Sequence, residues 1–532
     1  MKEIVYIQAG KRSNYAGTHF WNTQETYLSN AGSQEALDVD QDVSLMDSSH
    51  DEAKSTLCPR LLIFDTKSSF GTLSTSNALG EPDGEDDNSD ILWSGITQQI
   101  RHDRVPKSVY HDRMEQEVEK LSSDQDIQGV GNVRYWSDFS RVYYLPRSLQ
   151  KLPDQPELDT GDGEWNESHG LFNRFNEDTE LMDGSLRLLV ESCDNLQGLQ
   201  ISSDSDTFGG FMDAFFVSFR DEYLKIPTFT FALLPGVILS TPNVKEDDTR
   251  KIINEALYFR SLNEFSSMSI PVQGPQEWPH TAWNAFGHPE PQQLYRSSAI
   301  ISSHIESATL PFRLKREHRS MSDLCALLNW RGTGPFAELS GAFSFPSFTA
   351  ARGIITEFSC LSSKPKDQYA RVDILRGATK DDTTSYYEWA SRYTQSRARC
   401  ESVSVIDPYK TNKQPKLNPR PAVPASNVFP SDSRCGVQIK RIKVLTFAVT
   451  RLNHPASPTD SPANLGFTKA YSAMSTSSSM AEAFKNYASV VEKSMQNGTA
   501  AKATDMNSDD LRELANDLWT IHDNMAEVER DL

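Results

Sequence analysis

Hydrophobic and polar residues alternate along the first half of the chain in a pattern that predicts strands followed by helices. EIVYIQ (3–8) carries a continuous apolar run, which is typical of a strand buried on both faces of a parallel sheet. RLLIFD (60–65) predicts a second strand of the same kind. After Gly10, small or apolar residues recur every three or four positions and define one face of a helix. These residues are Ala16, Phe20, Thr23 and Tyr27.

The alternation of strands and helices continues to about residue 272. Helices are predicted at 180–192 and 254–265, and a third is marked by phenylalanines at helical spacing. These are Phe211, Phe215 and Phe219. The strands predicted between the helices are 198–202, 228–234 and 268–272. Such alternation predicts a doubly wound, Rossmann-type α/β sheet, in which ligands bind at the carboxyl ends of the strands.

The second half of the chain predicts a smaller α/β unit and two closing helices. A helix is expected at 296–308 and strands near 369–375 and 437–450, with a Pro/Lys-rich loop at 407–430. Apolar stripes predict helices at 479–495 and 509–525 that pack on the rest of the protein. The domains predicted from this pattern are 1–290, 291–455 and a C-terminal helical segment at 456–532.

Three polar inserts interrupt the first predicted domain. Residues 30–56 are acidic and rich in serine, 76–90 are acidic with Gly and Pro, and 153–169 are similar. This composition predicts surface loops.

Composition and charge narrow the classes of partner. The 53 basic and 73 acidic residues give a net charge of −20, which argues against direct binding of nucleic acid. The six cysteines are scattered, without metal-ligand spacing, so free thiols in a reducing compartment are expected. No apolar stretch is long enough to predict a transmembrane segment, and residues 3–8 already predict a core strand rather than a targeting peptide.

Several segments resemble tubulin, in the order in which tubulin has them. MKEIVYIQAG (1–10) is similar to the tubulin N-terminus, and CPRLLIFDTKSSFGT (58–72) to the second strand and its loop. ESCDNLQGLQ (191–200) is similar to a helix-to-strand junction, followed by DTFGG (206–210) in place of the glycine-rich phosphate loop. INEALYFRSLNEFS (253–266) resembles the helix on the sugar side of the nucleotide.

Two further blocks are features of one tubulin-like family. HFWNTQE (19–25) and YWSDFSRVYYLPRSL (135–149) resemble the Misato family, eukaryotic proteins linked to mitochondrial distribution and inheritance. The resemblance covers most of the chain. It implies a tubulin-like pair of domains, with a GTPase-fold domain first and a second α/β domain after it.

The tubulin resemblance also implies a set of candidate nucleotide-binding residues. Glycines and amides would cradle phosphates, and an acidic residue would face the magnesium. GTP is therefore the one cofactor that the sequence suggests, and no metal ligand set is predicted. The candidates are Gly10, Lys11, Asn14, Asp65, Thr207, Gly209, Gly210 and Asn254.

Several positions depart from what a tubulin-type GTPase needs. Lys67 stands where a second acid would face the metal, and Ala326 stands where an acid would orient the attacking water. Asp204 and Asp206 put carboxylates where a polyphosphate should lie, although a helix capped by its own Asp or Thr also explains them. Lys11 and Arg12 either attract phosphate or are exposed loop cations. GVGN (129–132) is similar to the third phosphate loop, with an ordinary turn as the alternative.

These departures predict a degenerate GTPase fold without catalytic residues. The expected function is that of a scaffold or assembly factor, peripheral on the cytosolic face of mitochondria and in the cytoplasm. It would support partitioning of mitochondria and inheritance of mitochondrial DNA through protein partners at the mitochondrial surface. Two alternatives stay open. One is a GTP-binding switch or polymerising GTPase. The other is a tubulin-folding or chaperonin-associated factor that acts on the cytoskeleton and has cytoskeletal or chaperonin proteins as partners.

Overall fold

The structure is a computed structural model of the 532-residue chain. It describes residues 2–29, 39–47, 56–74, 105–106, 108, 133–155, 163–235, 246–274, 294–315, 318–344, 358–359, 368–376, 394–405, 437–439, 469–498, 504 and 506–526.

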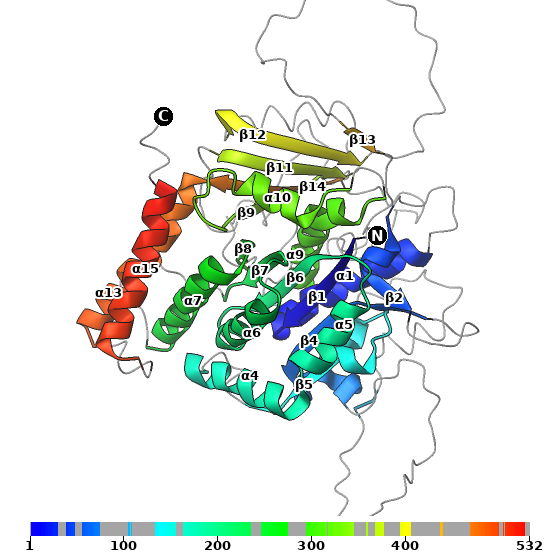
Figure 1. The fold of residues 1–532 in the computed structure, drawn as a ribbon, viewed down its shortest axis with the longest axis horizontal. Coiled ribbons are helices and arrows are strands. Elements are labelled where there is room, and N and C mark those ends of the chain that lie inside the picture. The colour runs from blue at the N-terminus through cyan, green and yellow to red at the C-terminus, as the bar shows by residue number, and fades with distance from the viewer. Residues whose placement is uncertain are drawn as a thin grey trace, which may run out of the picture.

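The first half of the chain builds a parallel sheet of six described strands. They are β1 (Glu3–Ala9), β4 (Leu61–Thr66), β5 (Leu149–Leu152), β6 (Leu196–Asp204), β7 (Thr228–Leu233) and β8 (Met268–Val272). Their order across the sheet is β5-β4-β1-β6-β7-β8, and every neighbouring pair is parallel. The α/β sheet predicted from the hydrophobic pattern is thereby confirmed (Figure 1).

Helices cover both faces of this sheet. On one face Val5 and Ile7 of β1 share a core with α4 (Trp165–Thr179), α6 (Gly209–Glu222) and α7 (Glu246–Phe265). On the other face Ile4 and Tyr6 share a core with α1 (Lys11–Ser29) and α9 (Leu294–Thr309). Because successive side chains of a strand point to opposite faces, a strand covered on both sides must be apolar throughout. This explains the unbroken apolar run of β1.

The second sheet is mixed and has six described strands. They are β9 (Glu338–Ser344), β10 (Phe358–Ser359), β11 (Gln368–Arg376), β12 (Thr394–Val405), β13 (Val437–Ile439) and β14 (Lys469–Ser477). Their order is β10-β9-β14-β11-β12-β13, and β14 pairs antiparallel with both β9 and β11. The sequence pattern assigned residues 469–477 to the C-terminal helical segment. That assignment is wrong for this stretch, because it forms a central strand of the second sheet.

Two helices close the described chain and pack on α7. These are α13 (Ala481–Gln496) and α15 (Ser508–Ala526), which contact each other and α7 (Figure 1). The apolar stripe of α13 is buried at Phe484, Tyr487 and Val491, as the sequence predicted. Short elements complete the fold: β2 (Leu45–Asp47), β3 (Leu57–Pro59), α5 (Arg187–Glu191) and α10 (Met321–Leu328), with the short helical segments η1 (Gln41–Val43), η3 (Lys67–Ser74), η5 (Trp136–Phe139), η6 (Pro146–Ser148), η7 (Met182–Leu186), η10 (Leu310–Arg313) and η13 (Ser478–Met480).

The predicted loop inserts are only partly loops. Residues 165–169 begin α4, and Ser168 is buried there, so the insert predicted at 153–169 ends too late. Within the first insert, Val43 and Leu45 are buried in η1 and β2. Residues 76–90 and 407–430 lie outside the described residues. Among the described helices, none combines the length and the apolar character needed to cross a bilayer.

A buried ion network joins the two halves of the protein. Glu306 of α9 accepts hydrogen bonds from Arg313 at 3.0 Å and from Tyr27 of α1 at 3.0 Å, and it also pairs with Arg376 of β11. Glu306 and Arg313 are fully buried, and Arg376 nearly so. Burial opposes ionisation of Glu306, but the two guanidinium groups outweigh it and hold the pKa of the carboxyl below its ordinary value. The network therefore stays ionised inside the core.

Candidate nucleotide site

The candidate site lies where the strand order of the first sheet reverses. The chain runs outward from β1 through β4 to β5, and then returns to place β6 on the other side of β1. In open α/β sheets, ligands bind at the carboxyl ends of the strands at such a point. Here β1 ends at Ala9, Gly10 follows it, and α1 begins at Lys11 with its first backbone amides directed at this crevice.

Asp204, at the end of β6, occupies the amino terminus of α1. Its carboxylate accepts the backbone N–H groups of Arg12 and Ser13, each at 2.8 Å, and the Ser13 hydroxyl at 2.7 Å. The Arg12 guanidinium pairs with Asp206 and lies 3.7 Å from Asp204. Burial raises the pKa of Asp204, while Arg12 acts in the opposite direction. The donors that a phosphate would use are therefore already bound to the protein's own carboxylate.

Gly10 makes room for this carboxylate. Its φ of +100° lies in the region that favours glycine, and a Cβ added there would sit 2.6 Å from Cγ of Asp204. Gly10 is thus required by the approach of Asp204. A bound phosphate is not needed to explain it.

Asp65, the candidate metal-facing acid, is enclosed by hydrogen-bond donors. It accepts Asn14 Nδ2 at 2.8 Å, the Thr66 backbone N–H at 2.9 Å and the indole N–H of Trp136 at 3.2 Å. Burial raises the pKa of Asp65 to about 7. Lys67, two residues further on, is exposed. A carboxylate already bound by three N–H groups has little capacity left for a magnesium ion.

The glycines at the start of α6 serve helix packing. A Cβ on Gly209 would lie 2.9 Å from Cζ3 of Trp165, and one on Gly210 would lie 2.4 Å from the Trp165 carbonyl oxygen. Ser168 of α4 accepts the Phe211 backbone N–H and donates to the Thr207 carbonyl, both at 3.1 Å. The sequence favoured a cap by an Asp or Thr of the loop. That interpretation is wrong for α6, where Ser168 from α4 accepts the N–H and no side chain of the N-cap residue does.

Gly210→Ala tests this assignment. We expect the variant to lose about 1–3 kcal/mol of unfolding free energy, because its new methyl group would meet the backbone of α4. Gly170→Ala in α4 is the matched control. Its Cβ would approach only the flexible end of Arg174, at 3.3 Å, so we expect it to gain up to about 1 kcal/mol from helix propensity. Urea unfolding measures both, and equal effects of the two substitutions would contradict the packing role.

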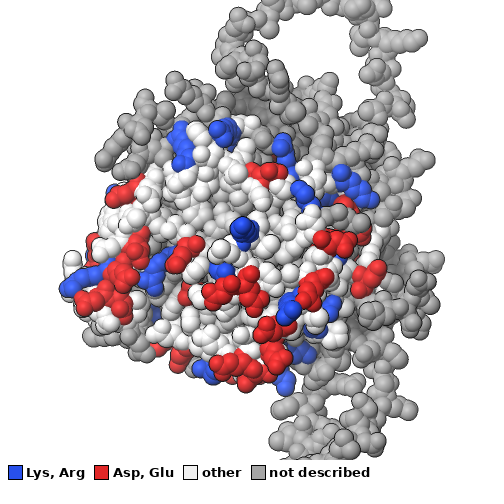
Figure 2. All heavy atoms as spheres, viewed as in Figure 1, with Lys and Arg blue, Asp and Glu red and all other residues white. Residues whose placement is uncertain are grey.

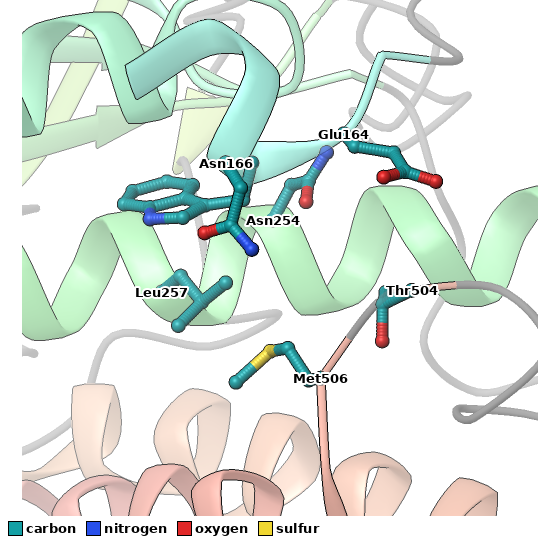
Figure 3. A pocket seen from close by; sticks show the side chains of 7 residues that line it. Glu164, Asn166, Asn254, Leu257, Thr504 and Met506 are labelled. Carbon is teal, nitrogen blue, oxygen red and sulfur yellow. The ribbon is translucent and has the colours of Figure 1, made fainter. Parts of the chain in front are cut away.

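Asn254 of α7 is engaged with the loop before α4. Its Nδ2 donates to the Gly163 carbonyl at 3.0 Å and so fixes the loop before α4. Its side chain lines a pocket with Trp165, Leu257 and Met506 (Figure 3). The space inside it that a water molecule can reach is about 10 Å³, enough for about one water molecule.

Glu255, next to Asn254, extends the buried charges of the site toward the C-terminal helices. Tyr487 of α13 donates a hydrogen bond to it at 2.5 Å, and the charges of Asp206 and Arg12 act on it. Burial is the main cause that raises the pKa of Glu255 to about 8.

The raised pKa of Glu255 predicts that stability falls as pH rises. Between about pH 4.5 and 8 the folded protein holds a proton that the unfolded chain releases, so the free energy of unfolding decreases across this window. Asp65 acts in the same direction up to about pH 7. In Glu255→Gln we expect a flatter dependence between pH 5 and 8, by up to about 1.4 kcal/mol per pH unit. Urea unfolding at several pH values measures it. The exposed Glu482→Gln should leave the slope unchanged, and a wild-type slope in Glu255→Gln would contradict the prediction.

Two further residues, Lys11 and Asp323, make no contact that the structure records with the groups around Asp204. Lys11 is exposed at the first turn of α1. Asp323 belongs to the first turn of α10, where its backbone N–H donates to the capping Ser320 hydroxyl at 3.1 Å. Residues 129–132 lie outside the described residues.

The assembled geometry does not fit a magnesium nucleotide. Gly10, Asn14 and Asp65 come together around the start of α1, where Asp204 accepts the backbone N–H groups and Trp136 donates to Asp65, while Asn14 Oδ1 is buried without a hydrogen-bond partner in the described part of the chain. Thr207, Gly209 and Gly210 are engaged with α4, and Asn254 with the loop before it. Among the described residues, no cluster of three or more His, Cys, Asp or Glu side chains is placed to hold a metal ion.

Comparisons with known proteins identify the family to which the chain belongs. A family model described as "Misato Segment II tubulin-like domain" matches residues 2–116, and one described as "Tubulin domain" matches residues 128–314. Protein DML1 of Gibberella zeae is 32% identical over 64% of this chain and 67% of its own length. The chain belongs to the Misato family. The tubulin-like fold and the family resemblance predicted from the sequence are both confirmed.

Other Misato-family relatives align over a similar part of the chain. Protein DML1 of Phaeosphaeria nodorum is 33% identical over 59% of this chain, and Protein dml1 of Aspergillus clavatus is 34% identical over 60%. The aligned stretches cover 59% and 62% of those two relatives. The chain thus matches about three fifths of the length of these relatives.

Three residues that sequence reasoning did not assign to the site shape it in this Misato-family protein. Trp136 lies within the block typical of the family, and its indole reaches Asp65. Glu255 lies in the mostly apolar stretch IINEALYF of α7, a pattern that signals a buried carboxyl group. Ser168 carries no signal, because its capping role depends on how α4 packs on α6.

Proposed function

We propose that this Misato-family protein is a non-enzymatic, tubulin-like scaffold or assembly factor. It supports the partitioning of mitochondria and the inheritance of mitochondrial DNA from the cytosolic face of the organelle. The organelle role is carried over from what the family resemblance implies. The contacts in the candidate site support the proposal that the protein does not turn over GTP.

The observation that carries the non-enzymatic proposal is the position of Asp204. Two backbone amides and a hydroxyl at the start of α1 bind its carboxylate, and Arg12 adds a cation close by. A nucleotide phosphate would have to displace the carboxyl group of Asp204, which is part of the chain itself. It would also meet repulsion from Asp206.

A GTP titration tests this part of the proposal. We expect no saturable binding of labelled GTP with magnesium up to about 1 mM, which corresponds to a binding free energy of about −4 kcal/mol. Saturable binding that is abolished by Lys11→Ala would instead support the alternative of a GTP-binding switch.

The mitochondrial part of the proposal needs a cellular test. We expect deletion of the gene to disturb mitochondrial morphology and retention of the mitochondrial genome. The Lys11→Ala variant should restore both, because Lys11 is exposed and has no role in a site that holds no nucleotide. Normal mitochondria after deletion would refute the organelle role.

The scaffold role predicts protein partners. Affinity purification of the full chain should recover proteins of the mitochondrial surface. Recovery of tubulin and chaperonin subunits in near-stoichiometric amounts would favour a cytoskeletal folding factor instead.

A further inference from the structure

Positive charge gathers around α10, although the whole chain carries a net charge of −20. Figure 2 shows Lys and Arg side chains along the part of the molecule that carries α10 and β12, and Asp and Glu side chains around α4 and the C-terminal helices. At the amino-terminal end of α10, Lys2 and Arg319 are exposed. Both act on Asp323, whose pKa is lowered mainly by the Ser320 hydroxyl and further by these two cations.

The other end of α10 carries a stacked arginine–tryptophan cluster. The Arg399 and Arg331 guanidinium groups lie 4.4 Å and 4.9 Å from the centre of the Trp330 ring. Arg331 also lies 4.5 Å from the centre of the Tyr369 ring. The Trp330 indole N–H donates to the Tyr369 carbonyl at 3.0 Å. Trp330 is thus held in one orientation; it and Arg331 are half-buried, and Arg399 is exposed.

The exposed face of α10 between the two ends is small and uncharged apart from Asp323. Ser322 and Ala326 are exposed, and Leu327 is half-buried. An eight-residue helix is about 12 Å long, so the two cationic ends are separated by roughly the span of four extended residues. Asp323 is the acidic residue of α10, and its carboxylate already accepts a hydrogen bond from the Ser320 hydroxyl.

We propose that the α10 surface, formed by Lys2, Arg319, Trp330, Arg331 and Arg399, binds an acidic segment of a partner protein. Tryptophan and arginine are the residues most often found at energetic centres of protein interfaces. The complementary charge of the segment favours this surface, while the acidic remainder of the molecule repels the segment elsewhere. The inference does not depend on the nucleotide site or on the organelle proposed above.

A binding assay with the full chain and a fluorescein-labelled decaglutamate peptide tests the surface. We expect saturable binding at low salt. The affinity for the peptide should fall at least tenfold when the ionic strength is raised to about 0.15 M or higher. The double variant Arg319→Gln/Arg399→Gln should lose at least a further tenfold at low salt. Both side chains are exposed, so the fold should be unaffected. Arg512→Gln, an exposed arginine of α15 whose side chain is 63% accessible, is the matched control and should bind as the wild type does.

Three outcomes would overturn the proposal. The first is no saturable peptide binding, or an equal loss in the Arg512→Gln control. The second is self-association of the wild type that is lost in the double variant, which would make a second copy of this chain the occupant. The third is binding to phosphatidylserine vesicles that the double variant abolishes, without peptide binding, which would assign the surface to a membrane.

Discussion

Replacing Glu306 by alanine should cost about 3–5 kcal/mol of unfolding free energy. The substitution leaves the guanidinium groups of Arg313 and Arg376 buried without their shared carboxylate, and removal of one partner from a buried ion network has a cost of this size. Tyr27 of α1 would lose its acceptor as well. Urea unfolding followed by circular dichroism measures the change.

The control for this prediction is an ion pair at the surface. Glu482 lies 3.5 Å from Lys485 on α13 with 66% of its side chain exposed, so Glu482→Ala should change stability by less than about 1 kcal/mol. Glu306→Gln should fall between the two, because an amide keeps one acceptor but loses the charge. A loss below about 1 kcal/mol in Glu306→Ala would mean that the network contributes no more than an exposed pair.

Asp204→Ala should destabilise the protein by about 3 kcal/mol and create sensitivity to inorganic phosphate. The substitution removes the acceptor of two buried backbone amides and a hydroxyl, and it leaves Arg12 with one carboxylate fewer. An anion that binds the vacated helix terminus at ten times its Kd would return about 1.4 kcal/mol. Thermal unfolding in phosphate and in chloride of equal ionic strength measures both effects.

The wild type and Asp204→Asn are the controls for this experiment. The wild type should show no specific response to phosphate, because Asp204 already occupies the amides. Asp204→Asn should respond less than Asp204→Ala, because its amide oxygen replaces only one of the two carboxylate oxygens that accept the N–H groups of Arg12 and Ser13. If phosphate stabilises the wild type as strongly as Asp204→Ala, Asp204 does not act as a built-in anion.

The sequence predicted five of the six described strands of the first sheet because these strands carry apolar runs, whereas it missed the four-residue edge strand β5, whose sequence LQKL has none. Continuous apolar runs such as those of β1 and β4 have few alternatives in a soluble fold, and the phenylalanines of α6 mark its buried face clearly. The assignment of 469–477 failed for a different reason. In that strand buried serines and threonines pair with distant neighbours, so its sequence lacks the apolar run that marks a core strand.

The candidate site was predictable in its residues but not in its contacts. The strand–glycine–helix pattern located the loop at Gly10, and the carboxylates of Asp204 and Asp206 could be recognised as unfavourable to phosphate. The sequence could not say that Asp204 caps α1, because that contact joins residues 191 and 192 positions apart. The packing role of Gly210 was equally hidden, since it depends on how closely α4 approaches α6.

The central position of β14 has a consequence for how the protein is made. Its neighbours β9 and β11 leave the ribosome about a hundred residues before it, and they cannot pair through it until nearly the whole chain has emerged. Until then each presents an unpaired strand edge to other nascent chains, a recognised route to aggregation. Synthesis of this protein should therefore depend on a chaperone that shields these edges, and a chain cut before residue 469 should accumulate in the insoluble fraction.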